Sequence, residues 1–427
     1  MDTKRIYAEE WQTKRYKEYA EHNYYNITSP TIETVTNGTI LPAQKYKNED
    51  DLTCFKGGVV DENNRFCENS KHIHEFGTEL GSLKSAYEFD KNKLEIRNEK
   101  VIYGGILYKH FGHFLIEGTS RLWCAVSSEE KLPVAFVLED NKTIAPQNLQ
   151  FLEYLGIAGN RLLLITKPTK FDEVVVPEQS GVIQGYYTDK FLLPFQAVTD
   201  KIQAKSEDRI YFSRRKFKGS IQLIGEEKLE KVFKDNGYKI IYPEKISLEE
   251  QVAYVKGAKE IACVMGTAAH LALFANRGIK SIILERTEHI NREQLLINQA
   301  KELNWFSVSA NMNYLPVGHE FSPILMGITE NFAEFLTNHN YKFDIKQVNK
   351  ISDRNIRKFN QAWFSRFSSK KHNPLIWGIE DIYAKRVGKY CTTAFLSLRQ
   401  RLFLKRTEGA YRVYTILGFT FKVRRKK

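Results

Sequence analysis

Three side chains suited to acid–base chemistry share a helical spacing in the first half of the chain. His113, Glu117 and Arg121 lie within residues 108–123 (YKHFGHFLIEGTSRLW), a segment that is otherwise largely apolar. Residues at i, i+4 and i+8 line one face of a helix. A glutamate one turn from a histidine can orient the imidazole and raise its basicity, which suits a general base near neutral pH. The pattern predicts a catalytic His113 supported by Glu117.

Other interpretations of this segment stay open. Glu117 could act as the base itself if burial raised its pKa, and His110 is a weaker candidate because it precedes the predicted helix. A solvated helix face with a capping histidine would have the same spacing. His110 and His113 also form an HxxH pair, but a third ligand at useful spacing is missing, so we expect no metal site.

A second set of candidate residues directly follows predicted strands. Ser213, Arg214 and Arg215 follow one strand, and a Gly-Thr-Ala-Ala turn at 266–269, leading to His270, follows another. In parallel α/β sheets the carboxyl ends of the strands face the ligand crevice. Paired arginines there can fork onto a diphosphate, and small residues let a phosphate approach the backbone amides of a helix start. Ordinary surface charge and a plain strand–helix turn are the alternatives.

Signatures of several other chemistries are absent from the sequence. It has no Asp-x-Asp, GxSxG, HExxH, Walker A or GxGxxG pattern. An Asp-x-Asp is one way to hold a divalent metal on a nucleotide diphosphate, so we do not expect a metal there.

The elements that would position these residues alternate between strand and helix from residue 100 onward. Strands are expected at 100–108, 134–138, 162–165, 174–176, 209–213, 238–242, 260–264 and 281–284. Helices are expected at 112–126, 148–155, 226–236, 247–257, 267–276 and 292–303. Ser247 and Glu250 form a capping box, and Gly237 suits the left-handed residue that ends a helix. This alternation predicts an α/β protein with parallel sheets.

The pattern divides the chain into three parts. Residues 1–204 form a first α/β domain whose first 100 residues look irregular, and a boundary falls near Lys205. Residues 205–310 form a doubly wound domain. Residues 311–427 form a helical, basic extension with an amphipathic helix expected at 382–405.

Composition and charge narrow the class of protein. The chain has 427 residues, 42% of them hydrophobic, so it can bury sizeable cores and is not a disordered or fibrous protein. The five cysteines form no CxxC pair, which favours a reducing compartment. The first 25 residues are charged throughout, so no signal peptide is expected.

The positive charge is concentrated at one end of the chain. Residues 341–427 contain 22 Lys and Arg against 5 Asp and Glu, a net charge of +17, whereas the other 340 residues carry −4. Such asymmetry indicates an anionic partner, either a membrane surface or a nucleic acid.

The order of these segments resembles glycosyltransferase family 61. The similarity covers roughly residues 100–300: HFGHFLIEGTSR, then RIYFSRRK, then YPEKISLEEQVAYVKGAKEIACVMGTAAH, then IKSIILE. Two places depart from the family pattern, Ser220 and residues 265–267. The resemblance implies a GT-B fold, in which two Rossmann-like doubly wound domains face each other across a cleft. It also implies inverting, metal-independent transfer from a nucleotide sugar.

The resemblance and the motifs lead to one functional expectation. We expect a cytoplasmic glycosyltransferase, peripheral on the inner face of the membrane, that extends a capsule, O-antigen or lipopolysaccharide glycan or its lipid-linked precursor. Catalysis is expected from His113 and Glu117, with no cofactor beyond the nucleotide-sugar substrate. Substrate contacts are expected from Arg121, Ser213, Arg214, Arg215, Gly266, Thr267, Ala268, Ala269, His270 and Glu285.

Two alternatives belong to other functional classes. A nucleic-acid-binding protein would explain the basic tail, but the sequence has no such signature and we expect no nucleic acid. The second alternative is a homologue that binds sugar nucleotides but does not catalyse transfer. Such a protein would share only the donor-binding residues with an active glycosyltransferase.

Overall fold

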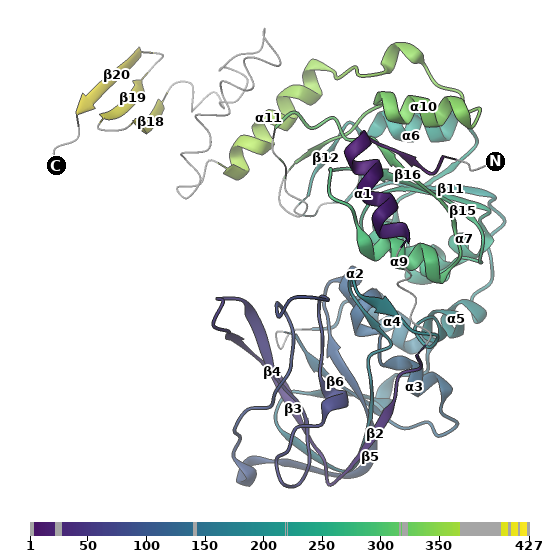
Figure 1. Cartoon of the computed structure of the whole chain (residues 1–427), viewed down its shortest axis with the longest axis vertical. Helices are drawn as coiled ribbons and strands as arrows, with labels where there is room; N and C mark the ends of the chain where they lie inside the picture. The colour runs from purple at the N-terminus through teal and green to yellow at the C-terminus, as the bar shows by residue number, and fades with distance from the viewer. Residues whose placement is uncertain are drawn as a thin grey trace.

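Two lobes, each built on its own sheet, make up most of the molecule (Figure 1). The computed structural model describes residues 4–21, 28–139, 143–217, 219, 221–315, 317, 323–367, 403–408, 411–416 and 419–424. The expected α/β class is present, and each lobe presents strand ends and short helices to the other.

The sheet of the second lobe is parallel throughout, in the order β13-β11-β14-β15-β16-β1. Its strands are β1 (Ile6–Tyr7), β11 (Arg209–Phe212), β13 (Lys239–Ile241), β14 (Glu260–Val264), β15 (Lys280–Glu285) and β16 (Asn304–Ser309). Its helices are α6 (Glu226–Asp235), α7 (Leu248–Gly257), the one-turn α8 (Thr267–His270) with a 3-10 turn at Leu271–Phe274, and α9 (Arg292–Ala300). Most of these bounds agree with the sequence prediction to within three residues. The exceptions are the helix expected at 267–276, which is two short turns, and the strands β1 and β16, which were not expected.

The strand order creates a topological switch point between β11 and β14. Five strands that follow one another in the chain lie in the order second, first, third, fourth, fifth, the flavodoxin-like doubly wound order. From β11 the chain first adds β13 on one side and then returns to add β14 on the other side. The connections that follow β11 and β14 therefore diverge, which in such sheets leaves a crevice at the carboxyl ends of the two strands. Arg214 follows β11, and the Gly266 turn follows β14.

Two helix boundaries in this lobe are formed by the residues predicted from the sequence. Ser247 accepts a hydrogen bond from the Glu250 amide, and the Glu250 side chain reaches back to Ser247, so α7 begins with a complete capping box. Gly237 ends α6 with φ 82°, a left-handed conformation that favours glycine.

The prediction that the first 100 residues are irregular is wrong. β1 lies beside β16, and α1 (Glu10–Glu21) packs on the second lobe, where Tyr16 meets Ile290 and Leu295. The strands β2 (Ile32–Thr36), β3 (Thr39–Lys47) and β4 (Thr53–Val60) then join the sheet of the first lobe. Burial along these strands does not alternate: β2 is exposed at four of its five residues, β3 is buried only in its first half, and β4 has no exposed residue. The period-2 pattern that predicts a strand is therefore missing from their sequences.

The first lobe holds a seven-stranded mixed sheet rather than a second doubly wound parallel one. Strands β5 (Glu95–Leu107), β6 (Val134–Leu138), β7 (Leu162–Ile165) and β8 (Thr169–Pro177) pair in parallel, but β2, β3 and β4 are antiparallel. One face packs on α3 (Leu122–Ser127), α4 (Pro146–Tyr154) and α5 (Leu193–Asp200). The other face is covered by the antiparallel strands, where Ile40 and Val59 pack with Ala135 and Val137.

The helix expected at 112–126 is interrupted. It divides into α2 (Phe111–His113), a π-helical turn (Phe114–Gly118) and α3. The Thr119 amide donates to the Phe114 carbonyl five residues earlier, and the Thr119 hydroxyl donates to the Leu115 carbonyl at 2.7 Å. The wider turn rotates the residues that follow, so Arg121 leaves the face shared by His113 and Glu117.

Part of the expected C-terminal extension belongs to the second lobe. β12 (Leu223–Ile224) pairs with β17 (Ile324–Leu325), while α10 (Glu330–Asn338) and α11 (Asp353–Phe367) pack on this lobe. The amphipathic helix expected at 382–405 lies outside the described residues, except that 403–405 begin a strand. β18 (Phe403–Glu408), β19 (Tyr411–Ile416) and β20 (Phe419–Arg424) form an antiparallel sheet. Among the described helices, none combines the length and hydropathy needed to cross a bilayer.

The two lobes share buried contacts. Apolar residues of α3, α4 and α5 form one core with α7 and the turn after α8. In α9, Glu293 accepts hydrogen bonds from the Tyr187 hydroxyl of β10 (Tyr186–Tyr187) and, at 2.9 Å, from the Gln184 amide. The connection between α5 and β11 contains Lys205, near which we placed the boundary between the lobes.

Candidate active site

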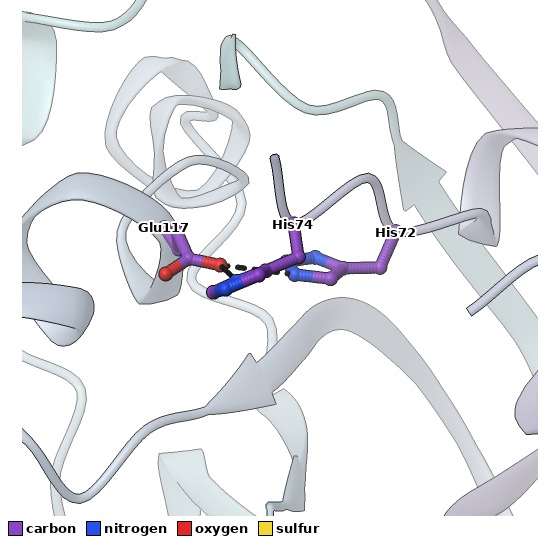
Figure 2. A group of neighbouring side chains, drawn as sticks. All are labelled: His72, His74 and Glu117. Carbon is purple, nitrogen blue, oxygen red and sulfur yellow. Dashed lines mark hydrogen bonds and ion pairs between the residues drawn. The ribbon is translucent and has the colours of Figure 1, made fainter. Parts of the chain in front are cut away.

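A buried carboxylate, Glu117, is the centre of the candidate site in the first lobe. Its side chain is 0% exposed, and its Oε1 lies 2.6 Å from His113 Nδ1. The other oxygen, Oε2, lies 2.5 Å from His74 Nδ1 and 3.4 Å from His72 Nε2. The Tyr108 hydroxyl is 2.8 Å from the same nitrogen of His72. Figure 2 shows His72 and His74 converging on the carboxylate from one extended segment.

The pKa values in this cluster follow from burial and hydrogen bonding. Burial by itself raises the pKa of Glu117, but hydrogen bonds from His113, His72 and His74 outweigh it and hold the value far below the ordinary one. Burial lowers the pKa of His72. For His74 burial acts in the same direction, but hydrogen bonding to Glu117 and its charge raise the pKa overall. Glu117 is therefore an anion.

His113 is the member of this cluster that solvent reaches most easily. Its side chain is 40% exposed, against 19% for His74 and 3% for His72. An ionised carboxylate can only accept hydrogen bonds, so Nδ1 of His113 carries the proton and the neutral form of the ring has its lone pair on Nε2. The residue is thus held in the tautomer that can accept a proton from a bound hydroxyl group.

Arg121 is a structural residue in this fold, not part of an open substrate face. It is 1% exposed, and its guanidinium donates to the carbonyls of Asn69 at 2.6 Å, Lys71 at 2.5 Å and Pro177. These bonds fix the segment that leads into His72. The sequence pattern misplaced Arg121 because the π-helical turn breaks the spacing of a regular helix.

Two arginines converge on the switch point of the second lobe. A Cβ atom at Gly266 would lie 3.2 Å from Arg214 Nη1 and 3.4 Å from Arg286 Nη1, and Gly266 has φ 140°. Arg214 Nε is buried and has no hydrogen-bond partner within the described residues. Burial also lowers the pKa of Arg214. Two guanidinium groups therefore lie over the glycine turn, near the ends of β11, β14 and β15.

Arg215 and Ser213 do not take part in this convergence. Arg215 forms an ion pair with Glu230 of α6, and Ser213 is fully buried and donates to the same carboxylate at 2.5 Å. The two neighbouring arginines therefore have different surroundings. Arg214 lies near Gly266, whereas Arg215 is paired with Glu230 of α6.

The remaining predicted substrate residues differ in burial, and most of them lie in the core. Thr267 is half-buried, whereas Ala268 and Ala269 are buried. His270 is buried beside Gln294 of α9, which lies 3.2 Å from its Nδ1, and burial lowers its pKa to about 4. Glu285 is buried and accepts hydrogen bonds from Tyr16 at 2.5 Å and Ser307 at 2.8 Å, and burial raises its pKa to about 7.

The two halves of the candidate site meet at one close contact. A Cβ atom at Gly112 would lie 2.9 Å from the Thr267 hydroxyl, so α2 of the first lobe packs against the β14–α8 turn of the second. The absence of a side chain at residue 112 permits this approach. It brings the helix start that carries His113 next to the turn lined by Arg214 and Arg286.

Sequence reasoning missed Arg286, His72 and His74. Arg286 directly follows β15, so the argument applied to Arg214 would have found it. His72 and His74 occur as a His-x-His pair in a region interpreted as irregular, and nothing local links them to Glu117, more than forty residues later. The His110–His113 pair considered in the sequence is not part of this cluster.

One family model matches the chain. Residues 111–283 match the family described as Glycosyltransferase 61. The match runs from α2 to β15, so it includes His113, Glu117, Arg214 and the Gly266 turn, while His72, His74 and Arg286 lie outside it. It supports the resemblance to family 61 inferred from the motifs. The search of curated proteins returned no match.

The structural role of Arg121 can be tested by Arg121→Lys. A lysine cannot reach three carbonyls at once, and hydrogen bonds to charged groups contribute about 1.5–3 kcal/mol each. We expect the free energy of unfolding, measured by urea titration, to fall by about 2–4 kcal/mol.

The matched control is Arg65→Lys, because Arg65 is exposed and paired only with Asp61. That variant should change stability by less than about 0.5 kcal/mol. If Arg121→Lys kept wild-type stability but lost substrate binding, Arg121 would be reassigned as a substrate-binding residue.

Proposed function

We propose that the protein is an inverting glycosyltransferase that moves a sugar from a nucleotide-sugar donor to a hydroxyl group, without a metal on the diphosphate. The family match supports glycosyl transfer. The observation that carries the proposal is the close approach of Gly112 to Thr267, which supports it because the helix start with His113 then lies beside the switch-point turn near Arg214 and Arg286. In this proposal the two lobes act as the acceptor and donor halves of a GT-B enzyme.

The donor half would be the crevice around Gly266. Arg214 and Arg286 lie beside the glycine, so a diphosphate there would gain charged hydrogen bonds from their guanidinium groups. The helix dipole adds little because α8 has one turn. As the bond from the anomeric carbon to the diphosphate oxygen breaks, the leaving group takes the electron pair, and the arginines stabilise its charge.

The acceptor half would be the surface around His113. Nε2 of His113 would accept the proton of the acceptor hydroxyl as its oxygen bonds to the anomeric carbon from the face opposite the diphosphate. Glu117 holds the ring and stabilises the imidazolium that forms. Glu117 is not the base in this proposal, because its side chain is inaccessible to an acceptor.

The proposed acceptor is a growing surface glycan or its lipid-linked precursor, and the proposed place is the cytoplasmic face of the membrane. β19 and β20 support membrane docking. Phe419, Phe421 and Val423 are 79%, 46% and 49% exposed, and Phe419 pairs with the exposed Ile416. An exposed apolar face within a segment of net charge +17 suits an anionic bilayer surface.

The catalytic assignment is tested by His113→Ala. Loss of a general base costs about 10²–10⁴-fold in rate. We expect kcat to fall at least about 10²-fold, with donor affinity and melting temperature close to wild type. The readout is transfer to a glycan acceptor under saturating donor.

His110→Ala is the comparison, because the His110 side chain caps α2 and, within the described residues, forms no hydrogen bond with Glu117. It should retain most of the turnover. The base would be reassigned if His110→Ala or Glu117→Gln abolished transfer while His113→Ala did not. A wild-type protein that binds nucleotide sugars but never turns them over would favour the non-catalytic alternative.

The donor assignment is tested by comparing Arg214→Lys with Arg215→Lys. A lysine cannot reproduce the forked contact of a guanidinium with a diphosphate. Arg214→Lys should weaken binding of a nucleoside diphosphate about 10–100-fold in calorimetry, the equivalent of one or two charged hydrogen bonds. Arg215→Lys should leave affinity unchanged, since Arg215 is paired with Glu230. Equal affinities for wild type and Arg214→Lys would refute the assignment.

Membrane docking is tested by replacing Phe419 and Phe421 together with serine. Binding to vesicles containing phosphatidylserine should decrease, because apolar burial is lost, and binding by the wild type should decrease as salt is added. Ile345→Ser is the control, an exposed apolar residue (68%) outside this sheet. If neither the double substitution nor added salt weakened vesicle binding, this surface would be ruled out as the membrane-docking site. Tight binding to single-stranded RNA instead would support the nucleic-acid alternative.

A further inference from the structure

We propose that His72, His74 and Glu117 bind a divalent transition-metal ion of the zinc type. The three ligand atoms all lie within 4.8 Å of one another. They come from an extended segment and a π-helical turn that are distant in sequence. This inference goes beyond the proposed transfer reaction, and its readouts do not depend on transferase activity.

The geometry needs little change to accept an ion. Zinc bonds to imidazole nitrogen and carboxylate oxygen are about 2.0–2.2 Å long, so ligand atoms around a tetrahedral ion are about 3.3 Å apart. His72 Nε2 is already 3.4 Å from Glu117 Oε2. His74 Nδ1 must move from 2.5 Å to about that distance. The proton that His74 Nδ1 now donates would leave as the ion binds.

The ligand set selects the class of metal. Two imidazoles and one carboxylate suit zinc and its neighbours in the first transition series. Magnesium and calcium prefer oxygen ligands only, so they fit poorly. Three protein ligands leave a position for water or for the Tyr108 hydroxyl, which lies 2.8 Å from His72 Nε2.

The segment that carries the histidines is held in place from outside the cluster. Gln179 accepts from the Ile73 amide at 2.7 Å and donates to the Ile73 carbonyl at 3.2 Å, so the residue between the two histidines is fixed twice. Arg121 binds the carbonyl of Lys71. Such supporting hydrogen bonds orient the direct ligands of metal sites. The 19% exposure of the His74 side chain leaves a route by which an ion can enter.

The proposed ion is compatible with the role of His113. Oε1 of Glu117 contacts His113, whereas Oε2 faces His72 and His74. The ion would therefore lie behind the base, in the first lobe, and would not touch the donor diphosphate. It would lock the segment from His72 to His74 against the π-helical turn.

The experiment measures metal in the full-length protein. The purified protein is analysed for metal content, stripped with a chelator, and titrated with Zn²⁺ by calorimetry and with Co²⁺ by visible absorption. The variants are His72→Gln and His74→Gln, with His339→Gln as control because His339 lies at the end of α10 beside Tyr7. Unfolding of every stripped variant is measured to confirm that it is folded.

The proposal expects about one equivalent of bound metal and a cobalt absorption band in the wild type and in His339→Gln. Loss of a residue that only supports a ligand weakens metal affinity about 10–100-fold. Loss of a direct ligand in His74→Gln or His72→Gln should therefore weaken it at least about 100-fold. Zinc should also raise the melting temperature of the wild type and of His339→Gln, but not that of His72→Gln or His74→Gln. A wild type that takes up neither zinc nor cobalt, or equal affinity in folded His74→Gln, would overturn the proposal and leave a cluster joined by hydrogen bonds alone.

Discussion

The burial of one negative charge, on Glu117, determines the architecture of the candidate site. A carboxylate removed from water is stable only when donors or cations surround it. Three imidazoles from two distant segments supply this environment, and Tyr108 completes it beside His72. To bring them together, the chain widens a helix into a π turn and fixes the segment 69–73 with Arg121 and Gln179. The exposed His113 is positioned as a result of these constraints.

The site was predictable where chemistry depends on local spacing. A glutamate four residues after a histidine contacts it in an α-helix and also across this π turn, so the pairing of His113 with Glu117 was found. Arg121 lies one turn further, past the irregularity, and its expected position was wrong. Nothing in the sequence between Phe114 and Thr119 distinguishes a π turn from a regular helix, because the difference depends on which carbonyl the Thr119 amide selects.

The second lobe was predictable because its elements carry their own boundaries. The capping box of α7, the glycine after α6 and the short buried strands are all local signals. In the first lobe β6 and β7 were predicted for the same reason, but β2 and β3 were not, because they are stabilised by pairing with residues more than a hundred positions away, such as Thr34 with Val175. Contacts of that range leave no trace in a single sequence. The same limit hid the pairing of His72 and His74 with Glu117.

The pairing of β1 with β16 has a consequence for how the protein is made. Ile6 is synthesised about 300 residues before its partner Ser307. At typical rates of about 5–20 residues per second, the first strand is exposed for roughly 15–60 s before its partner exists. Through this interval the nascent chain must keep an apolar strand from associating elsewhere, so β1 is made before the other strands of its sheet but is among the last of them to find its place there.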